Sequence, residues 1–155
     1  MPVTPAVPVG VVAESIGVDA RVVEVGVDEK GQMAVPLDVA TVGWYRFGPG
    51  PGAVEGSAVL SGHVDDYEQG RGAFYRLAEL APGEQVRVRL ADGAALDYRV
   101  RTVARMPKDE LPLDQVFARD GPPVLTLVTC GGAFNRAASV YTENVVVTAE
   151  PVIAP

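Results

Sequence analysis

The sequence predicts a mainly β fold: a closed or nearly closed barrel of about eight strands with one or two short helices. Short apolar segments rich in β-branched residues recur along the 155 residues, and 17 glycines and 13 prolines separate them as turns. Strands and helices do not alternate regularly, which favours an antiparallel-type barrel over a parallel sheet. With 48% hydrophobic residues, the chain can bury the core of one such domain.

The first half of the chain is expected to open with two or three strands. The segments 11–18 and 20–28 alternate apolar and polar residues, and 28–32 (DEKGQ) is typical of a hairpin turn. The GPGPG sequence at 48–52 predicts a rigid, irregular loop. The strand expected next, within 57–66, is built from small and apolar residues.

The second half is expected to hold one hairpin, two further strands and the short helical segments. Leucine and phenylalanine at helical spacing mark the first helix, and alternation of Val or Leu with Arg marks the hairpin. In chain order we expect a short helix at 72–80, hairpin strands at 85–90 and 96–105, one or two helical turns at 108–117, a strand at 124–130, a loop at 131–139 and a final strand at 141–152.

One domain is expected to occupy nearly the whole chain. Residues 1–15 are interpreted as a Pro-rich N-terminal segment and residues 16–155 as the folded domain. No window of about 18 apolar residues predicts a membrane-spanning helix. The first dozen residues lack the basic start and small-residue cleavage site of a signal peptide. Two interpretations remain open, a whole soluble protein or the soluble part of a chain that carries an N-terminal anchor.

The charge and the metal-binding residue types limit the partners. The net charge is −7 and no basic block is present, so nucleic acid is not an expected partner. One cysteine and one histidine allow no intrachain disulfide and do not make up a Cys/His metal site, so we expect neither a metal nor another cofactor. The acidic residues Asp65, Asp66 and Glu68 are interpreted as a solvated loop rather than a calcium site.

The single cysteine and the single histidine occupy equivalent positions. Cys130 and His63 each lie at the C-terminal end of a small or apolar strand that leads into a glycine-containing loop. A thiol has an ordinary pKa of about 8.5 and is a better nucleophile when a cation or a base lies beside it. Together the two residues suggest a nucleophile with its general acid–base partner. Each also has a structural interpretation, a buried small hydrophobe for Cys130 and a polar strand-end residue for His63.

Three segments of the chain resemble the sortase transpeptidases. They are VLSGHV with His63, LTLVTC with Cys130, and the closing strand YTENVVVTA, and residues 126–130 match the T-L-x-T-C motif of that family. The segments 42–52 (VGWYRFGPGPG), 62–66 (GHVDD) and 129–135 (TCGGAFN) are similar to the class F sortases of actinobacteria. The likeness runs from about residue 16 to about residue 150.

The resemblance implies a sortase-type eight-stranded β-barrel that acts on the outer face of a Gram-positive plasma membrane, at the cell wall. It implies that Cys130 attacks the Thr-Gly bond of an LPXTG-like sorting signal and forms a thioacyl enzyme, which an amine then resolves. His63 would be the general acid and base. The implied partners are LPXTG-containing surface proteins and an amine acceptor on peptidoglycan or lipid II. The enzyme would be a monomer, anchored by a segment that precedes this sequence, with residues 1–15 as the linker.

Further site residues are implied around the nucleophile. Class A sortases carry an arginine on the last strand, but the corresponding stretch here has none, and Arg136 is the only arginine that follows Cys130. We assign the oxyanion contact to Arg136, with Asn144 as a neutral alternative and the Gly131 N–H as a second donor. Period-2 alternation places Ser61 on the same strand face as His63, so Ser61 is a substrate-binding candidate. Thr129 either contacts substrate or braces its strand.

Two other functions would suit the same residue types. An L,D-transpeptidase also uses Cys and His on a β-rich fold, but its H-G-C-x-R type of cluster is absent from the TCGG segment. A non-catalytic extracellular β-barrel for binding or adhesion would carry the same residues incidentally. The chemical reactivity of the Cys130 thiol would distinguish such a binding module from an enzyme, because a buried structural thiol resists alkylation.

Overall fold

Eight strands close into one barrel in the computed structural model, which describes residues 7–27, 36, 38–63, 65–66, 70–107, 113–135 and 140–152. Within these ranges, the side chains of residues 65–66, 70, 107, 113, 130–135 and 140–143 lie outside the description. The barrel strands are β1 (Pro8–Ala13), β2 (Val18–Val25), β3 (Val42–Tyr45), β4 (Ser57–Gly62), β7 (Gln85–Leu90), β8 (Ala95–Pro107), β9 (Val124–Asn135) and β10 (Val140–Pro151).

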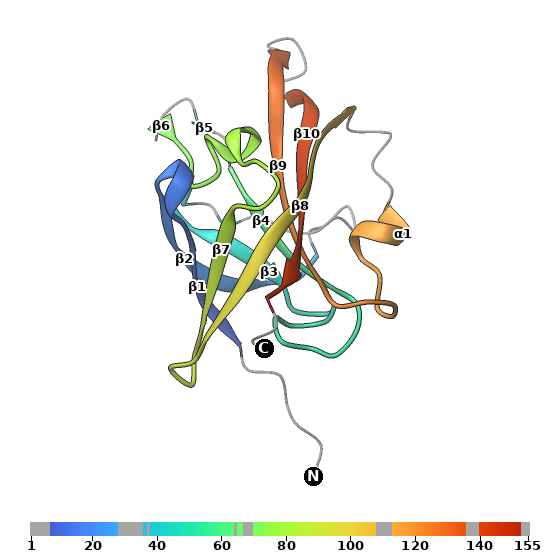
Figure 1. Ribbon diagram of the computed structural model, residues 1–155. Coiled ribbons are helices and arrows are strands. Elements are labelled where there is room, and N and C mark those ends of the chain that lie inside the picture. Colours follow the sequence, from blue (N-terminus) through green and yellow to red (C-terminus); the bar gives the residue numbers. More distant parts are fainter. Residues whose placement is uncertain are drawn as a thin grey trace.

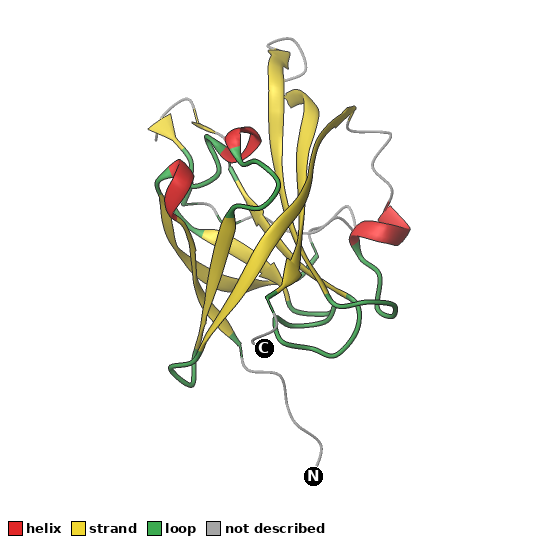
Figure 2. Ribbon diagram, viewed as in Figure 1, coloured by secondary structure: helices red, strands yellow, loops and turns green. Residues whose placement is uncertain are grey.

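The strands follow the order β1-β2-β3-β4-β9-β10-β8-β7 around the barrel, and β7 closes it by pairing with β1 (Figure 1). A separate two-stranded sheet pairs β5 (Asp65–Asp66) with β6 (Gly70–Arg71). The described helices are short: η1 (Glu14–Ile16), η2 (Leu77–Glu79) and α1 (Leu113–Val116). The predicted mainly β, eight-stranded barrel with few short helices is confirmed (Figure 2).

Two of the barrel interfaces differ from the antiparallel pattern. β2 pairs with β3 and β4 pairs with β9 in parallel, whereas the other neighbouring pairs in the barrel are antiparallel. Parallel neighbours need a crossover connection, because a tight hairpin can join only antiparallel strands. The hairpin turn expected at 28–32 lies outside the described residues, and the next barrel strand, β3, runs parallel to β2.

The core fills the inside of the barrel because apolar residues alternate with polar ones along each strand. In β7, for example, Val86, Val88 and Leu90 are buried and the residues between them are exposed. Phe74 and Leu77, each 1% exposed, belong to the same core cluster and come from the segment that contains η2. Figure 1 shows η1 and η2 at one end of the barrel, the end beyond which β9 and β10 project.

The observed element bounds differ from the expected ones at the N-terminus and at the helices. β1, at residues 8–13, belongs to the barrel although it falls inside the segment 1–15, because Val11 and its neighbours pair with both β2 and β7. The helix expected at 72–80 is only η2, preceded by turns. Of the segment 108–117, residues 113–116 form α1, and residues 108–112 lie outside the description.

The strand of Cys130 is longer than predicted. Cys130 was expected to end it, but β9 continues to Asn135, and the expected loop at 131–139 is therefore wrong for residues 131–135. The physical reason is the pairing with β10, which holds an extended backbone through the glycines: Tyr141 lies opposite Phe134 and Glu143 opposite Gly131.

Candidate active site

The parallel pair of β4 and β9 brings the single histidine and the single cysteine to the same place. The register runs from Ser57 opposite Val124 to Gly62 opposite Thr129. His63 directly follows Gly62, and Cys130 directly follows Thr129. Neighbouring strands lie about 4.8 Å apart, so the two backbone positions are adjacent at this end of the barrel. The two strand ends recognised in the sequence therefore meet.

The backbone at His63 is held by contacts with the segment that precedes η2. The carbonyl oxygen of His63 accepts a hydrogen bond from the N–H of Phe74 at 3.0 Å. A Cβ atom at Gly72 would overlap that same carbonyl group, and one at Gly62 would lie 2.7 Å from the Phe74 ring. Glycine is required at both positions because the two segments of the chain approach too closely for a side chain.

Thr129 braces the strand pair directly before the candidate nucleophile. Its side chain is buried, at 3% exposed, and its hydroxyl donates a hydrogen bond to the carbonyl oxygen of Gly62. The hydroxyl proton of Thr129 is thus already engaged in a hydrogen bond within the protein. Of the two roles that the sequence left open for Thr129, this geometry favours the bracing role over a substrate contact.

The imidazole ring of His63 is oriented by a backbone carbonyl. Nε2 lies 2.6 Å from the carbonyl oxygen of Pro36, and the side chain is half-buried. A carbonyl oxygen can only accept, so Nε2 carries the proton of this hydrogen bond. In the neutral ring Nδ1 is then the unprotonated nitrogen, the one that can take up a proton. This contact has no signal in the sequence, since a backbone carbonyl 27 residues away leaves no side-chain pattern.

On its other side, β9 places Cys130 opposite Asn144 of β10. Asn144 is 8% exposed, and no hydrogen-bond partner satisfies its Oδ1 atom. Among the described residues it is the one buried side-chain nitrogen or oxygen left without a partner. His63, Cys130 and Asn144 thus occupy adjacent positions on three consecutive strands.

The β9–β10 ladder is irregular just after Cys130. Between the pairs Glu143–Gly131 and Tyr141–Phe134, β9 contains one residue more than β10. Such a bulge leaves a residue outside the ladder and is common beside active sites. It falls at Gly132 and Ala133, directly after Gly131, whose N–H was expected to contact the oxyanion.

The structure places the remaining candidates less completely. Ser61 is half-buried on β4 between Gly43 of β3 and Val128 of β9. Arg136 lies outside the described residues, so its expected contact stays a prediction. Asp65 is described only as a strand residue of β5, and the described residues hold no group of three metal-ligating side chains.

A groove of about 440 Å³ runs over the outer faces of β8, β9 and β10. One wall comes from the segment of α1 and the loop after it. The groove reaches Met106, which pairs with Asn144, and Val146, two residues further along β10. At its other end it reaches Ser57, whose hydroxyl lies 2.7 Å from that of Thr126. A mainly apolar channel therefore leads along β9 and β10 toward the position of Asn144.

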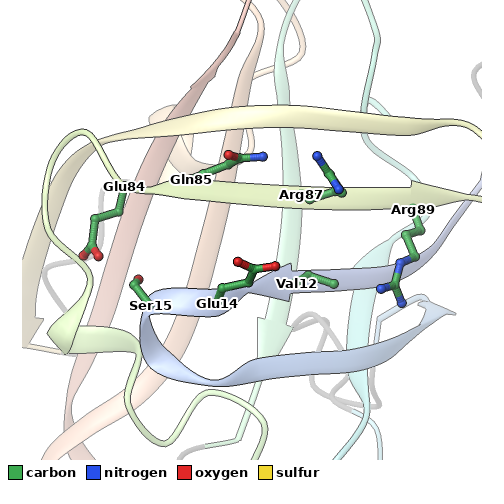
Figure 3. Close-up of a pocket in the computed structure, with 7 residues that line it drawn as sticks. All are labelled: Val12, Glu14, Ser15, Glu84, Gln85, Arg87 and Arg89. Carbon is green, nitrogen blue, oxygen red and sulfur yellow. The ribbon is translucent and has the colours of Figure 1, made fainter.

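A second hollow, of about 390 Å³, lies over β1 and β7 (Figure 3). It is lined by Val12, Glu14, Ser15, Glu84, Gln85, Arg87 and Arg89. Its two arginines are exposed and paired, Arg87 with Asp97 at 2.8 Å and Arg89 with Asp19 at 3.4 Å. These are ordinary surface ion pairs, and none of the candidate site residues lines this hollow.

A closed eight-stranded β-barrel with few short helices is the sortase fold, and the comparisons with known proteins agree. The model of the sortase domain matches residues 11–152, so this chain belongs to the sortase family of transpeptidases. No curated protein matches the chain. None of the described helices is long and apolar enough to span a membrane.

Solved sortase structures share the fold at low sequence identity. The lid mutant of sortase A from Corynebacterium diphtheriae has a TM-score of 0.72 at 16% identity, over 99% of this chain and 74% of that chain. Sortase C-1 from Actinomyces oris has a TM-score of 0.72 at 24% identity, over 98% and 77%. Sortase C1 from Streptococcus suis has a TM-score of 0.71 at 18% identity, over 97% and 75%. These similarities extend over almost the whole described barrel.

Proposed function

We propose that this sortase is a cysteine transpeptidase that cleaves an LPXTG-like sorting signal between Thr and Gly and transfers the acyl chain to an amine on the cell wall. The observation that carries the proposal is the parallel register of β4 and β9, which makes His63 and Cys130 neighbours in a sortase barrel. A nucleophile and its base must be within hydrogen-bond reach, and the adjacent backbone positions of His63 and Cys130 support such an arrangement.

In the first step, the Cys130 thiolate attacks the carbonyl carbon of the signal's Thr. A C–S bond forms, and the carbonyl electron pair moves to oxygen as an oxyanion. Collapse of this intermediate breaks the C–N bond to Gly, and the protonated His63 ring gives its proton to the leaving amine. The products are a thioacyl enzyme and the free C-terminal fragment.

In the second step, an incoming amine attacks the thioester carbonyl. Neutral His63 takes the proton from that amine through Nδ1, the nitrogen that the Pro36 carbonyl leaves free. The C–S bond breaks, the new amide is released, and Cys130 regains its thiolate. The protein's own groups balance both proton transfers, so the scheme needs no metal or cofactor.

The groove over β8, β9 and β10 is the proposed path of the sorting signal. Its exposed surface is mainly apolar, with side chains such as Val146 and Met106 that suit the Leu-Pro part of the signal. Ser61 and the backbone of Gly131 are proposed to contact the peptide near the scissile bond. Thr129 contributes by keeping β4 and β9 in register.

Arg136 is proposed to stabilise the oxyanion, as the family's arginine does, with the Gly131 N–H as the second donor. The finer assignment to class F, and with it an actinobacterial source, is part of the same proposal and is supported by the segments VGWYRFGPGPG, GHVDD and TCGGAFN.

The proposed partners are LPXTG-containing surface proteins and an amine of peptidoglycan or lipid II. The proposed location is the outer face of the plasma membrane, where a monomer is held by a segment that precedes this sequence. No observation favours the L,D-transpeptidase alternative. A negative cleavage test would instead favour the alternative of a non-catalytic adhesion module.

The test is cleavage of a quenched fluorescent LPXTG-type peptide, with mass spectrometry of the enzyme. The wild type is expected to cleave the peptide and to show a thioacyl adduct. Cys130→Ala is expected to lose both, and Arg136→Ala to cleave at least about ten-fold more slowly. Gln85→Ala, at an exposed position on β7, is the control that keeps full activity. Absence of cleavage and adduct with every signal variant would favour the adhesion module.

A further inference from the structure

The position of Asn144 on β10 is unusual for a polar residue. Residues 145, 147 and 149 of this strand belong to the core cluster, so Asn144, Val146 and Thr148 lie on the outer face. Asn144 is nevertheless buried, and its Oδ1 atom has no hydrogen-bond partner. A buried acceptor without a partner destabilises the folded protein, so the amide calls for an explanation.

Packing does not require an amide at this position. Val146, the next outward residue on β10, is 4% exposed and fills an equivalent place with an apolar side chain. Leucine has the same number and branching of side-chain heavy atoms as asparagine, although a larger volume, and it carries no polar atom that could be left unpaired. The amide therefore costs stability in the free protein, and polar groups that cost stability are common at binding sites.

The neighbours of Asn144 indicate what its amide serves. Cys130 lies directly opposite on β9, and directly opposite residues of an antiparallel pair share a face of the sheet. Met106, opposite on β8, lines the groove that leads to this point. A peptide that continues from the Met106 end of the groove toward Cys130 passes beside Asn144.

We propose that Asn144 is a substrate-binding residue whose Oδ1 accepts a hydrogen bond from a backbone N–H of the sorting peptide beside Cys130. The inference rests on the proposed transpeptidase function and adds a binding residue to it. A site built to hydrogen-bond a substrate group discriminates strongly, because its own polar atom stays unpaired without that group. Binding of the peptide then satisfies the atom that the free protein leaves unpaired.

The first test is Asn144→Leu, which removes the amide and keeps the branched shape of the side chain. The melting temperature is expected to stay the same or rise by a few degrees, because an unpaired buried atom is removed. The kcat/KM for the peptide is expected to fall at least ten-fold, mainly through a higher KM. An unchanged kcat/KM would mean that the amide does not contact substrate, and this result would overturn the proposal.

The second test is Asn144→Asp, which keeps an acceptor and adds a negative charge beside Cys130. The rate of Cys130 alkylation by iodoacetamide at neutral pH, without peptide, is expected to fall several-fold, because a nearby negative charge disfavours the thiolate. Gln85→Glu is the matched control, since it makes the same amide-to-carboxylate change at an exposed position on β7. Equal alkylation rates for the two variants would place Asn144 away from the thiol and overturn the proposal.

The two tests also separate this inference from the function on which it rests. If the wild type cleaves the peptide and Asn144→Leu cleaves it equally well, only the role of Asn144 fails. If no protein cleaves any peptide while Asn144→Asp still slows alkylation, Asn144 lies near the thiol but the transpeptidase function fails, and peptide binding by Asn144 fails with it.

Discussion

At the scale of the residue, the hydrogen bond between His63 and the Pro36 carbonyl defines which ring nitrogen can exchange protons. Catalytic histidines are often oriented by a carboxylate, whereas here the acceptor is a backbone oxygen at 2.6 Å. The acceptor carries no charge of its own. The orientation of the ring therefore depends on the backbone path at Pro36 rather than on a titratable neighbour.

This contact predicts a defined tautomer, which can be observed directly because His63 is the only histidine in the chain. In a ¹⁵N-labelled sample with a neutral ring, the proton is expected on Nε2, with a through-hydrogen-bond coupling to the Pro36 carbonyl carbon. Pro36→Gly, which frees the backbone at that carbonyl, is expected to weaken the coupling and lower kcat. A ring protonated on Nδ1, or a coupling unaffected by Pro36→Gly, would contradict the assignment.

At the scale of the element, the Thr129 hydroxyl links the ends of β4 and β9. Thr129→Val keeps the shape and leaves the Gly62 carbonyl without its donor. The free energy of unfolding is expected to fall by about 1–2 kcal/mol in urea titrations of the free enzyme. If Thr129 instead served the substrate alone, unfolding would be unchanged and only KM would rise. The two results distinguish the bracing role from the substrate role.

The β7–β8 hairpin predicts a pH dependence of stability. Arg87 hydrogen-bonds to Asp97 across the hairpin and lowers the pKa of that carboxyl below its ordinary value. A lowered folded-state pKa stabilises the protein above the unfolded-state pKa of about 3.9, and this contribution disappears as the pH falls through the folded-state value. Between about pH 5 and about pH 3, Asp97→Asn is therefore expected to lose less unfolding free energy than the wild type. Parallel losses would contradict the ion pair's role.

The sequence predicted those elements well whose formation depends on residues close together in the chain. The β7–β8 hairpin was found because Val and Leu alternate with Arg on both sides of a three-residue turn. The extension of β9 beyond Cys130 was missed, because Gly131-Gly132 has the local signal of a turn while the pairing with β10 that keeps it extended is not local. The parallel pairs were missed for the same reason.

At the scale of the whole molecule, the positions of His63 and Cys130 could be inferred from strand ends, but their proximity could not. It depends on the closure of the barrel through β4 and β9, which no local pattern encodes. Sequence reasoning did select Asn144 as an alternative contact, because it lies on the closing strand. It had no means of finding the Pro36 carbonyl.

The parallel interface between β4 and β9 also affects the order in which the protein folds. Thr129 and Gly62 are bonded across 67 residues of chain, and contacts of such long sequence separation form late and slowly. A chain that has folded only its hairpins has the cysteine and the histidine but not their adjacency. The thiol is then an ordinary one, with no base beside it. Refolding from urea is therefore expected to restore β structure before it restores the thiol reactivity proposed for Cys130, which requires the completed barrel.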